Sequence, residues 1–190
     1  MLLAWARNLI DLQTRGKPGA QTTATDAVVD RCNVLHLGKS VTSKIRKKLK
    51  AGEFDVFLCH NSEDKPVVKD IAKSLIERAI LPWLDEWDLR PGLSWQDALE
   101  RQIEQIKSAA VFVGKNGIGP WQRSELNAFL REFVERGCPV IPVLLPDAPS
   151  KPELPLFLKG MLWVDFRKQD PDPMVQLMWG ITGKRKLISS

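Results

Sequence analysis

The feature that most constrains the fold is a regular alternation of short apolar runs with longer amphipathic segments, from about residue 53 to residue 181. Short apolar runs bounded by turn residues are typical of buried strands, and apolar residues three and four apart are typical of helices. This alternation predicts a doubly wound parallel sheet. The predicted strands are 54–59, 80–84, 109–113, 139–145 and 161–166, and the predicted helices are 64–79, one from about 94, 121–136 and 173–181.

Length and composition favour one globular domain with an extension, since the chain has 190 residues, of which 44% are hydrophobic and 27% charged. The apolar opening segment is interrupted by Arg7 and Asp11 and lacks a small-residue cleavage site, so neither a signal peptide nor a membrane anchor is predicted. A cytoplasmic location is expected. The cysteines Cys32, Cys59 and Cys138 lack the spacings of zinc ligands, so reduced thiols and no metal site are expected.

Positive charge is concentrated near the two ends of the chain. Residues 1–50 carry ten Lys/Arg against three Asp/Glu, whereas residues 51–180 carry fifteen against twenty. The basic run 44–50 and the tail could contact a nucleic-acid backbone, an acidic lipid surface or an acidic partner. A solvated linker is the preferred interpretation of the run, because no aromatic residues are interleaved with it and no nucleic-acid motif occurs.

The predicted organisation has three parts. Residues 1–50 form a basic extension with short helices and a linker, residues 51–183 form the domain, and residues 184–190 form a basic tail. No membrane partner is expected. Any association with nucleic acid is expected to be indirect.

One helix start brings an indole and a carboxylate together. Trp121 and Glu125 are four residues apart, so they share one face of the helix predicted for 121–136. The preceding strand 109–113 has the pattern of a buried strand, which puts this helix start at the carboxyl edge of the sheet, where open α/β folds bind ligands. A half-buried acid beside an aromatic ring at this edge suggests a site.

The same residues also have a structural explanation. An acidic residue in a first helical turn meets free backbone amides and the positive end of the helix dipole. Pro120 suits the first helical position, and Trp121 can simply cover the core. Local chemistry alone favours this structural explanation.

Three segments, in order and at matching spacing, resemble one known family. Residues 54–65, FDVFLCHNSEDK, look like its opening strand and acidic loop. Residues 85–95, DEWDLRPGLSW, are similar to its BB loop with a Pro-Gly pair, and residues 121–125, WQRSE, match its WxxxE pattern. From about residue 54 to residue 183 the chain therefore resembles the TIR (Toll/interleukin-1 receptor) domain, in particular its bacterial branch.

The resemblance implies a flavodoxin-like sheet of five parallel strands in the order 2-1-3-4-5, with flanking helices. It also implies self-association through the BB loop, from Asp85 to Trp95, and cleavage of the nicotinamide–ribose bond of NAD, with Glu125 as the catalytic residue. NAD is then the substrate, and no cofactor is expected. The chemistry fits, because a carboxylate near the ribose stabilises the oxocarbenium-like centre that forms as nicotinamide leaves. Trp121, a further candidate for substrate binding, can provide an apolar wall that excludes water and so strengthens that interaction, or a stacking face.

Five further residues are candidates for substrate binding, each with a rival explanation. His60 and Asn61 follow the first strand and can hydrogen-bond the substrate, or act only as turn or cap residues. Ser62 can contact phosphate or serve as an N-cap. In the BB loop, Trp87 can meet an adenine ring or a neighbouring domain, and Arg90 can pair with a pyrophosphate or remain solvated.

The leading functional hypothesis is an NAD glycohydrolase of TIR type, activated by self-association and acting in bacterial immune defence. Its product is ADP-ribose or a cyclic ADP-ribose, and its trigger is a sensor domain or partner protein. The alternative is a non-catalytic TIR module that recruits other proteins through the BB loop. A third reading is a different nucleotide hydrolase, since a fold and one carboxylate do not determine the leaving group.

Overall fold

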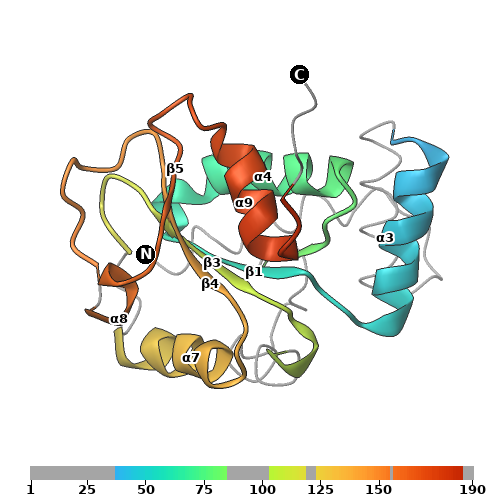
Figure 1. Ribbon diagram of the computed structural model, residues 1–190, viewed down its shortest axis with the longest axis horizontal. Helices are drawn as coiled ribbons and strands as arrows, with labels where there is room; N and C mark the ends of the chain where they lie inside the picture. Colours follow the sequence, from blue (N-terminus) through green and yellow to red (C-terminus); the bar gives the residue numbers. More distant parts are fainter. Residues whose placement is uncertain (1–36, 85–102, 119–122, 155, 186–190) are drawn as a thin grey trace, which may run out of the picture.

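A five-stranded parallel sheet forms the centre of the computed structural model, which describes residues 37–84, 103–118, 123–154 and 156–185 (Figure 1). The strand order β2-β1-β3-β4-β5 confirms the predicted order 2-1-3-4-5, which is that of a flavodoxin-like fold. The strands are β1 (Val56–Cys59), β2 (Pro82–Trp83), β3 (Ala109–Val113), β4 (Val140–Leu144) and β5 (Val164–Asp165).

Strand β3 is the most extensively paired strand. It pairs with β1 from Phe57↔Ala109 onward and with β4 over all five of its residues, each of which is buried. The outer strands β2 and β5 are only two residues long, shorter than the apolar runs 80–84 and 161–166 that predicted them. The reason is that an outer strand has one neighbour, so only the residues in register with it are held as strand.

Helices cover both faces of the sheet. They are α3 (Lys39–Ala51), α4 (Lys65–Glu77), α7 (Arg123–Glu135), α8 (Leu156–Lys159) and α9 (Pro173–Thr182), with short 3-10 turns η1 (Ser62–Asp64) and η2 (Ile103–Gln105). One core cluster joins α4 and α9 to one sheet face, and the other joins α3, α7 and α8 to the opposite face. Alternate residues of β3 belong to the two clusters, as a strand buried on both faces requires. Of the helix predicted from about residue 94, residues up to 102 lie outside the described part of the chain.

Helix α3 occupies the basic run that was interpreted as a solvated linker. Its Ile45 is fully buried in the core, with Val41 and Leu49 packed beside it. Lys48 turns inward, where its Nζ lies 2.5 Å from Asp55 Oδ2 and 2.8 Å from the carbonyl oxygen of Ala79. The linker interpretation was wrong for 44–50, because three apolar residues at four-residue spacing form a narrow stripe that the surrounding cations obscure.

We expect Ile45→Ala to lower the free energy of unfolding by about 2–5 kcal/mol, because it leaves a cavity beneath α3. Chemical denaturation of the whole chain measures this. Val67→Ala is the matched control, since Val67 is 42% exposed on α4 and its truncation should cost little. Equal effects of the two substitutions would show that α3 is not part of the cooperative unit.

Candidate functional site

The carboxyl ends of β1, β3 and β4 bring three loops to one edge of the sheet. His60 and Asn61 follow β1, Gly114 follows β3, and Asp147 lies three residues after β4. His60 and Asn61 are both buried, at 8% and 3% exposure. The structure therefore places these two predicted site residues at the edge where parallel sheets bind ligands.

The ring of His60 is oriented by its own strand. Nδ1 lies 3.1 Å from the carbonyl oxygen of Leu58, and a carbonyl oxygen can only accept. Nδ1 therefore carries the proton, and in the neutral ring Nε2 is the acceptor. A buried imidazole held in one tautomer in this way is suited to receive a hydrogen bond from a hydroxyl or amide.

Asn61 and Ser62 are occupied by local contacts. Asn61 is the N-cap of η1, and its Oδ1 lies 3.4 Å from the Glu63 backbone nitrogen and 3.3 Å from Ser62 Oγ, both of which donate to it. The capping alternative is therefore confirmed for Asn61, whereas Ser62 is the first residue of η1 and not its N-cap. Contact with a substrate stays a prediction for both.

Asp64 is an acid in the same loop that the sequence analysis did not single out. Its side chain is buried, the Gly114 amide donates to its carboxylate, and Oδ2 has no hydrogen-bond partner within the part of the chain that the structure describes. Burial raises the pKa of Asp64 above its usual range, and the negative charge of Asp147 raises it further. The carboxyl group thus lies in an environment that favours its neutral form.

Because Gly114 has no side chain, the carboxylate of Asp64 can pack directly against its backbone. A Cβ atom on Gly114 would lie 2.1 Å from Asp64 Oδ1, closer than atoms can approach. The Asn116 side-chain amide also donates to Glu63 Oε2, and Gly117, with a φ of 70°, closes the turn by donating to the Gly114 carbonyl. Two contacts therefore hold the loop after β1 against the turn after β3. The only sequence signal for them was a glycine directly after a buried strand.

Glu125 belongs to the first turn of α7, the helix that follows β3. Its side chain lies outside the described part, and its role in a site stays a prediction. Trp121, Trp87 and Arg90 also fall outside the described residues, as does the loop from Asp85 to Trp95. The site that the structure describes consists of the loop after β1, the turn after β3 and the backbone of α7.

Within the described ranges, no three His, Cys, Asp or Glu side chains come together as metal ligands would. Over the same ranges, no helix has both the length and the apolar character needed to cross a membrane.

A family model described as "TIR domain" matches residues 56–178, which is well over half of the chain. The chain belongs to the TIR domain family. The matched region runs from the start of β1 into α9, so it contains the whole sheet and the candidate site. Helix α3 precedes the matched region and is an addition to it.

Two curated proteins are similar to this TIR chain over part of its length. The "NAD(+) hydrolase TcpA" of Theionarchaea archaeon (strain DG-70-1) is 29% identical over 113 residues, which cover 58% of this chain and 34% of TcpA. The "2' cyclic ADP-D-ribose synthase BtTIR" of Bacteroides thetaiotaomicron is 28% identical over 97 residues, which cover 48% of this chain and 32% of BtTIR. The chain thus spans about a third of the length of these relatives.

A solved structure supports the fold assignment. The TIR domain of the Toll-related receptor TRR-2 from Hydra magnipapillata aligns with a TM-score of 0.50 at 20% sequence identity. The alignment covers 66% of this chain and 94% of that domain. At this identity the similarity concerns the fold alone.

We expect Gly114→Ala to lower the free energy of unfolding by about 1–3 kcal/mol, because the new methyl group overlaps the buried Asp64 carboxylate. Gly180→Ala is the control, since the nearest atom there is the Ile141 Cδ1 methyl at 2.8 Å, which can rotate away. Urea denaturation measures both variants. The penalty at Gly114 should shrink in an Asp64→Ala background, and an unchanged penalty would refute the proposed overlap.

Asp64→Asn should raise the free energy of unfolding at neutral pH. The folded state holds the Asp64 proton more tightly than the unfolded chain does, so stability falls as the pH rises through the raised pKa of the folded state. Asparagine cannot ionise, so the advantage of the variant should shrink on acidification to about pH 3, where the unfolded carboxyl group is also largely protonated. Denaturation at both pH values measures this. Asp70→Asn, an exposed site on α4, is the control, and a pH-independent difference at Asp64 would contradict the explanation.

Proposed function

We propose that this chain is an NAD glycohydrolase of TIR type, which cleaves the nicotinamide–ribose bond. The observation that carries the proposal is the position of Glu125 in the first turn of α7, directly after the central strand β3 of a TIR fold. That location is the ligand-binding edge of an open α/β sheet. The name of the archaeal relative, an NAD(+) hydrolase, supports the same activity.

Glu125 acts in this proposal as an anion beside the ribose. As nicotinamide leaves, positive charge develops at the ribose C1′, and a nearby carboxylate stabilises it electrostatically without transferring a proton. Trp121 provides an apolar wall that excludes water. In a drier site the charge interaction is stronger, because the local dielectric constant is lower.

The loop after β1 binds the remainder of the substrate. The buried His60 ring offers Nε2 to a ribose hydroxyl, while Asn61 and Ser62 offer polar groups at the start of η1. Trp87 stacks on the adenine ring, and Arg90 pairs with the pyrophosphate. NAD is thus a substrate held by side chains, and the proposal includes no cofactor.

The biological setting is also part of the proposal. The enzyme acts in the cytoplasm in bacterial immune defence, and self-association through the loop from Asp85 to Trp95 activates it. A sensor domain or a partner protein supplies the trigger. Whether the product is ADP-ribose or a cyclic ADP-ribose depends on whether water or the adenine base reaches C1′ first.

A non-catalytic TIR interaction module is the second candidate. The same observation favours it, since an acid in the first turn of a helix stabilises the helix through its dipole and needs no substrate to explain it. In that case Glu125 contributes to the stability of α7, and the loop from Asp85 to Trp95 recruits other proteins. The two candidates differ in whether folded protein releases nicotinamide.

Glu125→Ala should lower the rate of nicotinamide release by about 10²–10³-fold, the usual effect of removing one electrostatic contact with a transition state. The assay follows NAD consumption by the purified chain over a wide range of protein concentrations, with products resolved by chromatography. Wild-type activity should rise faster than linearly with protein concentration. Glu132→Ala, an exposed acid on the same helix, should retain activity.

Two outcomes would reject the enzymatic proposal. One is the absence of nicotinamide release at every concentration from wild-type protein that is shown to be folded, which favours the interaction module. The other is an equal loss in Glu125→Ala and Glu132→Ala, which points to a general effect on α7.

A further inference from the structure

Helix α3 presents a continuous basic face to solvent. Taking about 100° per residue, five of its six cations fall within an arc of about 160° centred opposite the buried Ile45. They span about 17 Å of the helix axis. These residues, which we call the α3 basic face, are Lys39, Lys44, Arg46, Lys47 and Lys50.

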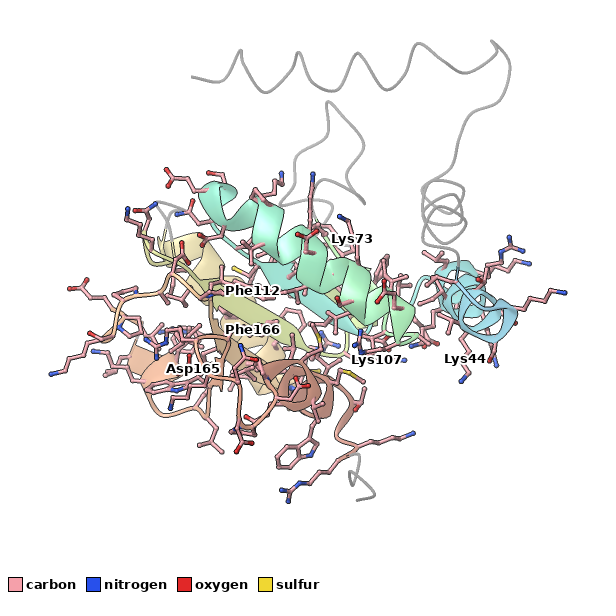
Figure 2. All side chains as sticks on the ribbon, turned by 90° about the horizontal axis from the view of Figure 1, so that it is seen from above. Lys44, Lys73, Lys107, Phe112, Asp165 and Phe166 are labelled. Atoms are coloured by element: carbon pink, nitrogen blue, oxygen red, sulfur yellow. The ribbon has the colours of Figure 1, made fainter. Side chains whose placement is uncertain are left out.

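The charges of the α3 basic face have no ion-pair partner among the described residues. All five side chains are exposed. The sixth cation, Lys48, is the one that turns inward to Asp55. Figure 2 shows α3 at one end of the molecule, with Lys44 pointing away from the sheet.

Hydroxyl groups accompany the cations. A surface hollow beside α3 is lined by Leu37, four of the five cations, Ser43, and Thr42, whose hydroxyl donates to the Gly38 carbonyl oxygen. Ser40 is also exposed on this side of the helix. Lysine, arginine and hydroxyl side chains are the groups with which proteins usually contact phosphate oxygens of a nucleic-acid backbone.

The opposite side of α3 argues against a membrane. A helix that lies on a lipid surface inserts an apolar face between the acyl chains. In α3 that face is already used, because Val41, Ile45 and Leu49 pack on the core. The outward side carries cations and hydroxyl groups, which can bind a polyanion without insertion.

We propose that the α3 basic face binds the phosphate backbone of a nucleic-acid duplex, independently of base sequence. A rigid helix with five charges over about 17 Å matches a regular row of phosphates, and the face has no aromatic side chain on which single-stranded bases could stack. The remainder of the domain is net acidic, so it directs a polyanion to α3. This proposal does not depend on NAD cleavage.

The test is fluorescence anisotropy of a labelled DNA duplex of about 24 base pairs, of arbitrary sequence, titrated with the full chain. With about four phosphate contacts, the logarithm of affinity should fall with the logarithm of salt concentration at a slope of about −3.6. Affinity should therefore drop about 150-fold between about 50 and 200 mM salt. An RNA duplex of the same sequence distinguishes the two possible backbones, and binding of either one supports the proposal.

The decisive variant is K39Q/R46Q/K47Q/K50Q, which should lose nearly all binding and most of the salt dependence. Its matched control is K151Q/K159Q/K168Q/K184Q, which removes the same number of charges from exposed sites outside α3 and should bind within about threefold of wild type. Circular dichroism first establishes that both variants are folded.

Three outcomes would overturn the proposal. One is the absence of duplex binding at low salt. Another is equal loss of binding in the two variants, which would show a response to net charge alone. The last is tighter binding to phosphatidylserine vesicles or to polyglutamate than to either duplex, which would identify a membrane or an acidic protein as the partner.

Discussion

Burial of β3 between β1 and β4 is the constraint on which the rest of the molecule depends. All five residues of this strand are buried and alternate between the two core clusters, so the strand joins the helices on both faces. Its parallel pairing brings the carboxyl ends of three strands to one edge. The loop after β1 and the turn at Gly114 are in contact there because the pairing of β1 with β3 brings them together.

The sheet was predictable from the sequence because its signal is local. An apolar run such as 109–113 is by itself a signal for a buried strand. The strand order was predicted from the family resemblance. Helix α3 was missed because the apolar stripe around Ile45 is narrow and the surrounding lysines dominate the composition. The contact between Asp64 and Gly114 was missed because it joins residues far apart in sequence, and neither residue type indicates its partner.

Asp64 is a buried acid at the carboxyl edge of the sheet. Within the described ranges its Oδ2 has no hydrogen-bond partner, and burial raises its pKa, so its ionised form destabilises the folded state at neutral pH. Local costs of this kind are common at functional sites, where activity rather than stability determines the residue. The predicted site residues His60 and Asn61 share this loop.

The location of α3 has a consequence for how copies of the chain can be arranged. Its Lys48 contacts Asp55, just before β1, so the helix lies at the amino edge of the sheet, and the loops after β3 and β4 lie at the other end (Figure 1). A nucleic-acid duplex bound along α3 would leave the carboxyl edge of the sheet uncovered. Each copy bound to one such duplex would keep that edge of its sheet accessible, and the local concentration of the copies would rise without any contact between their sheets.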